Sequence, residues 1–176
     1  MAVIGLDIGT TACKCAVISD DGRKLAEASA EYGITRSGGQ ASLDCVRLLA
    51  AVKGIVKTCA ETAKDKIKAI CVSSFGETFV PVDAKGAPLA DAMLYTDRRG
   101  EREAEELQKH GDLFAATAGV RPHQMYSLAK MMFIKHGQSE LYNSAFKFLQ
   151  IHDYIIFSLC GEAVTDYRSG QLVRNM

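Results

Sequence analysis

A short apolar strand followed by a glycine and two threonines is the first feature of the sequence that is suited to chemistry. Residues 2–8 (Ala-Val-Ile-Gly-Leu-Asp-Ile) form a nearly continuous apolar run, and the tight turn after it consists of Gly9, Thr10 and Thr11. Backbone N–H groups and hydroxyls at such a turn donate hydrogen bonds to phosphate oxygens, and Gly9 lets the backbone approach a ligand closely. Asp7 is placed to hold a water molecule on Mg²⁺. An ordinary hairpin turn is the alternative, but the strands on both sides favour phosphate binding.

Lys14 adds a positive charge to the same region. It follows Thr11 by three residues, where an ammonium group makes a charge-assisted hydrogen bond to a β- or γ-phosphate. The sequence contains no His-Glu-x-x-His, no Cys-x-x-Cys, no Gly-x-Ser-x-Gly and no Gly-x-Gly-x-x-Gly after a strand. These absences argue against a zinc hydrolase, a serine hydrolase and a dinucleotide-binding enzyme.

The elements that position this turn follow from the spacing of the apolar residues. Residues 14–19 and 24–32 predict two further strands, and Asp20-Asp21-Gly22 between them is a strong hairpin signal. Three sequential strands joined by turns this short are antiparallel neighbours. We therefore expect the phosphate turn to join the first two strands of an antiparallel sheet.

Helices and strands alternate along the rest of the chain. After a Gly/Ser-rich loop over 35–41, Ser42 or Asp44 is expected to cap a helix that runs to about Lys64. Its predicted apolar face consists of Val46, Leu49, Val52, Ile55, Val56 and Cys59. Residues 67–74 predict a buried strand that follows the helix as a parallel crossover requires. The other expected elements are a strand over 79–82 with a turn over 83–86, helices over 98–110, 126–136 and 152–159, a strand over 146–151, and a turn or strand from 161 to 165. This order predicts an α/β domain of the actin-like or ribonuclease-H-like type, with a mixed sheet of three antiparallel strands and then parallel strands with crossover helices.

Composition narrows the function classes. The 176 residues suffice for one ordinary domain, and 21 basic residues balance 21 acidic ones. A neutral chain has no global field for nucleic acid or an anionic membrane, and no apolar run approaches the ~20 residues of a membrane helix. The N-terminus does not resemble a secretory signal, most of the six cysteines sit in apolar runs, and Cys13 and Cys15 are spaced for one strand face. We expect a cytoplasmic protein with no nucleic-acid or membrane partner.

The motif at residues 7–11 resembles the first phosphate loop of the sugar kinase, actin and chaperone-ATPase superfamily. Other segments are similar to the FGGY family of carbohydrate kinases: residues 70–78 resemble its central strand and following loop, residues 82–89 its D-x-x-G-x-P-L turn, and residues 94–99 its W-x-D-x-R segment. The later matching positions are Gly119 with Lys130, 149–154, 159–162 and 165–167. Three positions depart from the family pattern. Tyr95 stands where the family usually has Trp, and residues 168–171 (Arg-Ser-Gly-Gln) replace Ser-Asn-Ala-Ser. The loop Gly76-Glu77 has neither the Met-His pair of xylulokinases (Gly-Gln-Met-His-Gly) nor the Arg-Glu pair of glycerol kinases (Gln-Arg-Glu-Thr).

The resemblance implies a sugar site. Glu77 and Thr78 occupy the place where the family contacts sugar hydroxyls, and Asp97 lies beside the sugar with Arg98 bracing it. The family position of Met125 and Tyr126 is the lining of the sugar pocket. The plainer alternatives are a solvated loop residue for Glu77, a helix cap for Asp97, and core packing for Met125 and Tyr126.

Other polar residues are expected to be structural. Asp153 and Asp166 are expected to fix turns through backbone hydrogen bonds. For His152, a surface or capping role is favoured over a catalytic pair with Asp153.

The implied activity is ATP-dependent and Mg²⁺-dependent phosphorylation of a hydroxyl of a ketopentose, a sugar acid or a polyol. The family's catalytic base is a later aspartate, expected beyond Met176, so residues 1–176 are expected to be an incomplete N-terminal actin-like domain without kinase turnover of its own. The alternative is a non-catalytic actin-like module that binds nucleotide weakly or serves as an assembly partner. Exposed apolar surface would favour association, including a homodimer. A phosphatase of the same superfamily shares the phosphate turn but does not account for the later segments.

Overall fold

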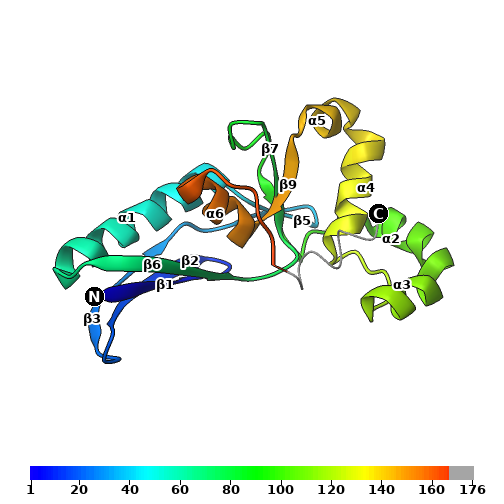
Figure 1. Cartoon of the computed structure of the whole chain (residues 1–176). Helices are drawn as coiled ribbons and strands as arrows, with labels where there is room; N and C mark the ends of the chain where they lie inside the picture. Colours follow the sequence, from blue (N-terminus) through cyan, green and yellow to red (C-terminus); the bar gives the residue numbers. More distant parts are fainter. Residues whose placement is uncertain (167–176) are drawn as a thin grey trace. The chain divides into compact units, whose positions relative to one another are not determined.

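The computed structural model describes residues 1–166, which form two compact units. The first unit contains residues 1–34 and 44–75, and the second contains residues 35–43 and 76–166. Figure 1 shows the helices and strands of the chain, coloured from the N-terminus to the C-terminus. Within residues 1–166, no helix combines the length and the apolar character that a membrane crossing requires. The family segments predicted at 167–171 lie outside the described residues.

A four-stranded sheet forms the first unit. Strands β1 (Ala2–Ile8), β2 (Ala12–Ser19), β3 (Lys24–Glu31) and β6 (Ile67–Ser74) lie in the order β3-β2-β1-β6. The pairs β1–β2 and β2–β3 are antiparallel, and β6 is parallel to β1. The predicted three-strand meander and the parallel crossover are therefore confirmed.

Helix α1 (Cys45–Ala63) provides the crossover and packs on β2 and β3. Asp44 is the N-cap, and its carboxylate accepts the N–H groups of Val46 and Arg47. The buried residues of α1 are Cys45, Leu48, Val52, Ile55 and Cys59. The predicted apolar face is wrong at Val46, which is 64% exposed, because Cys45 rather than Val46 shares the buried face of the helix with Leu48 and Val52.

Strand β6 is more exposed than its sequence indicates. Four consecutive residues from Lys68 to Cys71 are exposed, including Ile70. Helix α1 covers β2 and β3, and β6 forms the edge of the described sheet. The prediction of a buried strand is therefore wrong for the described part of the chain.

The second unit is built on a five-stranded sheet. Its strands are β4 (Thr35–Ser37), β5 (Gln40–Leu43), β7 (Phe79–Val82), β8 (Ala92–Met93) and β9 (Lys147–Gln150), in the order β4-β5-β8-β7-β9, and every pair is antiparallel. The hairpin β4–β5 corrects the predicted loop over 35–41. Gly38 and Gly39, which look like loop residues, have φ values of 55° and 82° at the hairpin turn, a conformation that favours glycine.

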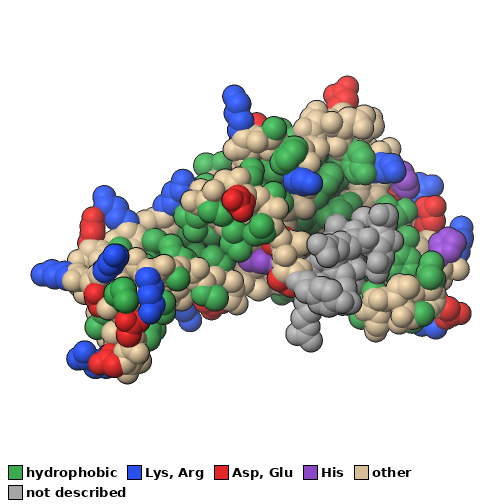
Figure 2. All heavy atoms as spheres, viewed as in Figure 1, with side chains coloured by type: hydrophobic (Ala, Val, Ile, Leu, Met, Phe, Trp, Pro, Cys, Tyr) green, Lys and Arg blue, Asp and Glu red, His purple; other side chains and the backbone are tan. Residues whose placement is uncertain are grey.

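Helices and a small apolar core complete the second unit. The helices are α2 (Glu101–Leu107), the 3-10 helix η1 (Gln108–His110), α3 (Gly111–Ala118), α4 (Ser127–Gly137), α5 (Ser139–Ser144) and α6 (Ile151–Cys160). The helices predicted near α2, α4 and α6 and the strand at β9 are confirmed, whereas the sequence did not predict α3 or α5. Phe79, Met93, Met131 and Ile134 form a core cluster between strands β7 and β8 and helix α4. Figure 2 shows charged side chains of both signs interspersed on the visible surface, as a neutral sequence leads one to expect.

Candidate functional site

The predicted phosphate turn joins β1 to β2. The Gly9 N–H donates to the carbonyl of Ala12 at 2.9 Å and closes the turn. A Cβ atom at Gly9 would lie 3.1 Å from the same carbonyl oxygen, so a larger residue would press on the turn. Gly9 therefore shapes the turn, and its own N–H is already used. The groups left to bind phosphate are those of Thr10 and Thr11.

Tyr32 supports this turn, and the sequence alone did not indicate it. Its hydroxyl lies within hydrogen-bond distance of the carbonyls of Gly9 and, at 3.2 Å, Ala12. Its backbone N–H donates to the Thr11 carbonyl at 3.0 Å. Burial raises the pKa of the Tyr32 phenol, so the hydroxyl keeps its proton and remains a donor. A tyrosine at the end of the strand that pairs with β2 is the only signal that could have suggested it.

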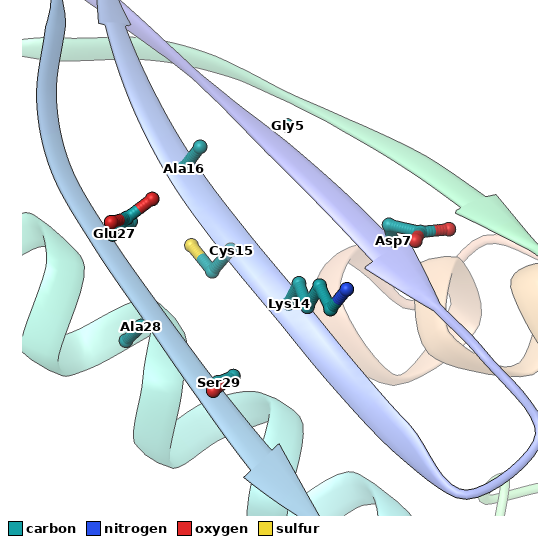
Figure 3. Close-up of a pocket in the computed structure, with 8 residues that line it drawn as sticks. All are labelled: Gly5, Asp7, Lys14, Cys15, Ala16, Glu27, Ala28 and Ser29. Carbon is teal, nitrogen blue, oxygen red and sulfur yellow. The ribbon is translucent and has the colours of Figure 1, made fainter.

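Asp7 and Lys14 lie directly opposite each other on β1 and β2. Figure 3 shows their side chains on neighbouring strands. Both line a depression of about 580 Å³, which Glu27 and Ser29 of β3 also line. All four side chains are exposed. Within residues 1–166, the side chains of Asp7 and Lys14 make no hydrogen bond and no ion pair. One carboxylate and one ammonium group are thus available to ligands beside the Gly-Thr-Thr turn.

This arrangement fits a magnesium–phosphate ligand better than a metal held by the protein alone. The described residues contain no group of three or more His, Cys, Asp or Glu side chains that could hold a metal ion. Magnesium keeps several waters and is commonly bound through one or two carboxylates together with substrate phosphates. A single Asp7 carboxylate therefore suits a hydrated Mg²⁺ carried by a nucleotide.

In the second unit, Glu77 is tied to the N-terminus of helix α4. Its Oε2 accepts the backbone N–H of Ser127 at 3.0 Å and the Ser127 hydroxyl at 3.3 Å. Glu77 has a φ of 55°, a left-handed conformation that few non-glycine residues adopt. Thr78 beside it is buried, and its Oγ1 accepts the Tyr95 N–H at 3.1 Å. The alternative of a freely solvated glutamate at position 77 is therefore wrong.

Asp97 is completely buried and fully hydrogen-bonded. Its Oδ2 accepts the Ala41 N–H at 2.8 Å, its Oδ1 accepts the Arg99 N–H at 2.9 Å, and the Arg99 guanidinium contacts both oxygens. Burial raises the pKa of the Asp97 carboxyl, but the bonds from Arg99 and the backbone outweigh burial and hold the pKa below its usual value.

Two predictions about the surroundings of Asp97 are wrong. The bracing residue is Arg99, because Arg98 pairs with Glu101 instead. Asp97 is also not a helix cap, since the N-cap of α2 is Gly100. A contact between Asp97 and a sugar stays a prediction.

A buried lysine completes this region. Lys130 is 0% exposed, and its Nζ donates to the Met125 carbonyl at 2.7 Å. Burial lowers the pKa of Lys130 to about 8, although the Glu77 and Asp97 carboxylates act in the opposite direction. The resemblance matched Lys130 to the family without a role; in the structure it anchors the residue that precedes Tyr126.

Met125 and Tyr126 lie on the segment that leads into α4. Met125 is 36% exposed, so the core-packing alternative is wrong for this residue. Tyr126 is half-buried, with its ring edge-on to His123 at 6.5 Å between centroids. Lining of a sugar pocket by these two side chains stays a prediction. Asp7 belongs to the first unit and Glu77 to the second, so their placement in one cleft also stays a prediction.

His152 is held between carboxylates. Its Nε2 lies 3.0 Å from Asp153 Oδ1 and 2.8 Å from Asp166 Oδ2. The interaction with Asp153 is the main cause that raises the pKa of His152. These contacts tie the segment after α6 back to the start of that helix, which is a structural role.

The chain is similar in sequence to known carbohydrate kinases. A model of the FGGY family of carbohydrate kinases, N-terminal domain, matches residues 2–171. The gluconokinase of Bacillus subtilis (strain 168) is 29% identical over 174 residues, which cover 94% of this chain and 33% of that protein. The xylulose kinase of the same organism is 29% identical over 171 residues, covering 94% and 34%. The chain thus spans about a third of the length of these relatives.

The fold agrees with this relationship. The crystal structure of the xylulose kinase from Rhodospirillum rubrum has a TM-score of 0.90 and 26% identity, over 97% of this chain and 37% of that one. The predicted α/β class with an actin-like mixed sheet is confirmed. Because the family model matches residues 2–171, nearly the whole chain, the chain belongs to the FGGY family of carbohydrate kinases.

Proposed function

We propose that this chain forms the phosphate-binding turn and part of the sugar site of an enzyme that transfers a phosphoryl group from ATP to a hydroxyl of a sugar, sugar acid or polyol. The observation that carries the proposal is the pair Asp7 and Lys14, which lie opposite each other beside the Gly-Thr-Thr turn. In the described part of the chain their side chains make no hydrogen bond or ion pair. Exposed opposite charges on adjacent strands ordinarily pair with each other. Their availability suits a ligand that itself carries both phosphate and Mg²⁺.

The phosphate end of the site uses three kinds of group. Lys14 makes a charge-assisted contact to a phosphate oxygen, and the Thr10 and Thr11 hydroxyls donate to others. Asp7 holds a water molecule of the magnesium ion. Phosphoryl transfer depends mostly on positioning and on neutralising the charge around the transferred group, and these residues serve that purpose.

The sugar end uses the second unit. Glu77 accepts the sugar hydroxyls, and Met125 and Tyr126 cover the apolar face of the sugar. Thr78 and Asp97, which are buried, hold the surrounding backbone through their hydrogen bonds to Tyr95 and Ala41. The bonds from Ser127 to Glu77 and from Lys130 to Met125 support this assignment, because they hold both residues in place. Protein groups that are already held in their binding positions lose less conformational entropy when a sugar binds. A homodimer, a cytoplasmic location and the lack of a nucleic-acid partner remain predictions from the sequence.

Nucleotide binding by the whole 176-residue chain tests the phosphate end. Calorimetric titration with ATP and Mg²⁺ should show Lys14→Met weakening binding about tenfold, the loss expected for one charge-assisted bond. Lys53→Met, which removes an exposed lysine on α1, is the matched control and should bind as the unchanged chain does. Equal affinity of the two variants would remove Lys14 from the site.

A further inference from the structure

We infer that Glu77, fixed in place by Ser127 and Gln150, makes the sugar site select neutral polyhydroxyl substrates and reject sugar acids. The inference rests on the proposed function, because it concerns the same site. Similarity does not decide the matter: the chain is 29% identical both to a gluconokinase and to a xylulose kinase. The loop shares Glu77 and Thr78 with the glycerol kinase pattern Gln-Arg-Glu-Thr, but it has Gly76 where that pattern has Arg, and it lacks the Met-His pair of the xylulokinase pattern. The preference for a neutral sugar or for a sugar acid must therefore come from the hydrogen-bonding groups of the site.

Hydrogen bonds from Ser127 hold the Glu77 carboxylate in one orientation. Its Oε2 accepts two bonds from Ser127, one from the backbone N–H and one from the hydroxyl. Ser127 is the first residue of α4, an eleven-residue helix, and a helix N-terminus favours a negative charge. In residues 1–166 no group donates to the other oxygen, Oε1. Glu77 therefore has one oxygen committed and one available.

Gln150 is hydrogen-bonded to Ser127, and the ionised Glu77 determines which of the two residues donates. Gln150 Nε2 lies 2.8 Å from the Ser127 hydroxyl, and both residues are buried. A hydroxyl has a single proton, and the Ser127 proton goes to Glu77 because an ionised carboxylate only accepts. Gln150 must then donate to Ser127, which makes it a positioning residue. Its own Oε1 is left buried, without a hydrogen-bond partner among the described residues.

Two positive charges of the described part of the second unit, on Lys130 and Arg99, are committed to protein groups. Lys130 is completely buried and bonded to the Met125 carbonyl, so a ligand does not reach its ammonium group. The Arg99 guanidinium contacts both oxygens of Asp97. What Glu77 offers a ligand is thus a negatively charged acceptor. A hydroxyl can donate to it, whereas the carboxylate of a sugar acid has no proton to give and is repelled.

Matched ligands test this selection directly. The amide signal of Ser127 in a ¹⁵N-labelled sample of the whole chain reports on the Glu77 carboxylate, and xylitol, D-xylulose and D-xylonate share five carbons but differ in charge. We expect xylitol and D-xylulose to shift this signal with dissociation constants at least about tenfold lower than that of D-xylonate, since like charges in one site repel strongly.

The variant Glu77→Gln reverses the polarity of the available group. Its amide oxygen still accepts both bonds from Ser127, and its NH₂ group takes the place of Oε1. We expect the ratio of the D-xylonate constant to the xylitol constant to fall about tenfold. Glu105→Gln removes an exposed glutamate on α2 and should leave the ratio unchanged. Because the ratio is measured within each variant, a partly unfolded sample does not alter it.

The possible outcomes separate the inference from the proposed function. D-xylonate binding as tightly as xylitol, or a ratio that Glu77→Gln leaves unchanged, would overturn the inference while the sugar site stands. If none of the three ligands shifts any signal of residues 77–78 or 125–127, the sugar site itself fails, and the inference falls with it. Preference for xylitol that Glu77→Gln abolishes and Glu105→Gln preserves would support both.

Discussion

At the scale of single residues, Asp97 is the most heavily bonded acid in the second unit. Asp97→Asn keeps the shape but loses the charge that Arg99 and two backbone N–H groups contact. We expect the free energy of unfolding to fall by about 3 kcal/mol, as when a buried ion pair loses one partner. Urea unfolding measures this change. Asp91→Asn, at an exposed position with only a long 3.4 Å contact from Ser42, should cost less than about 0.5 kcal/mol.

The pH dependence of that loss follows from the lowered pKa of Asp97. Because the pKa of Asp97 is lower in the folded chain than its unfolded value of about 4, the ionised carboxylate stabilises the folded chain at pH values above about 4. This contribution disappears as the pH falls through the folded value. The difference between the original chain and Asp97→Asn should therefore shrink below about pH 4. A difference that stays constant down to pH 3 would show that the charge is not what matters.

Lys130 also makes the free energy of unfolding rise with pH, but in the alkaline range. Its pKa of about 8, lowered from 10.5 by burial, means that the unfolded chain binds more protons than the folded one between these values. The free energy of unfolding contributed by Lys130 therefore rises from pH 8 to pH 10.5, by about 3 kcal/mol at most. Lys130→Met should lack this rise. The test compares the two unfolding curves over that range, because other groups that titrate there contribute equally to both.

Tyr32 gives a prediction for the phosphate turn. Tyr32→Phe leaves the carbonyls of Gly9 and Ala12 without the phenol donor. We expect a loss of about 1 kcal/mol in stability together with weaker ATP binding, measured by thermal unfolding and by calorimetry. Tyr142→Phe removes a hydroxyl that makes no hydrogen bond in the described part of the chain, and should change neither quantity.

At the scale of elements, helix α1 depends on its cap. Asp44→Ala removes the acceptor for the N–H groups of Val46 and Arg47, and should destabilise the chain by about 1 kcal/mol. Glu61→Ala in the same helix removes only an exposed ion pair, Lys57–Glu61 at 3.9 Å, and should have an effect below about 0.5 kcal/mol. Thermal unfolding of the two variants side by side checks the prediction.

The elements differ in how well the sequence predicts them. Strands β1 to β3 were predictable, and the cap of α1 was narrowed to Ser42 or Asp44, because apolar runs, tight turns and polar residues at a helix start act within a few residues. The hairpin β4–β5 was not, since Gly38 and Gly39 suit a flexible loop and a tight turn equally. The exposure of β6 was also missed, because an apolar run does not reveal which strands a helix covers.

At the scale of the whole molecule, the balance of charge makes a prediction about solubility. The chain has 21 basic and 21 acidic residues and no net charge at pH 7, and both signs are interspersed on the surface visible in Figure 2. Proteins associate most readily when their net charge is close to zero. We expect solubility, measured as the precipitation midpoint in polyethylene glycol, to be lowest near pH 7. A minimum outside pH 6 to 8 would contradict this expectation.

Activity is the second prediction at this scale. The 176 residues span about a third of the length of their relatives, and phosphoryl transfer needs both substrates and the surrounding charges in position. We propose that the chain assayed by itself does not phosphorylate pentoses, hexoses or polyols. A phosphorylated product that depends on ATP and on the chain, and that disappears with Lys14→Met, would refute this.

The sequence by itself determined the parts of this protein that depend on neighbouring residues. These are the strand and turn that carry Asp7, the nearness of Lys14 to that turn, a helix start at Ser42 or Asp44, and the family, because short spacings are preserved in any fold that contains them. Only the tertiary structure showed that Arg99 rather than Arg98 holds Asp97, that Ser127 fixes Glu77, and that Lys130 is buried beneath Met125. In some of these cases the two partners belong to different elements. In the case of Asp97 the two candidate partners, Arg98 and Arg99, are neighbours in the sequence with the same charge. Packing, which depends on the whole unit, decides which of them meet.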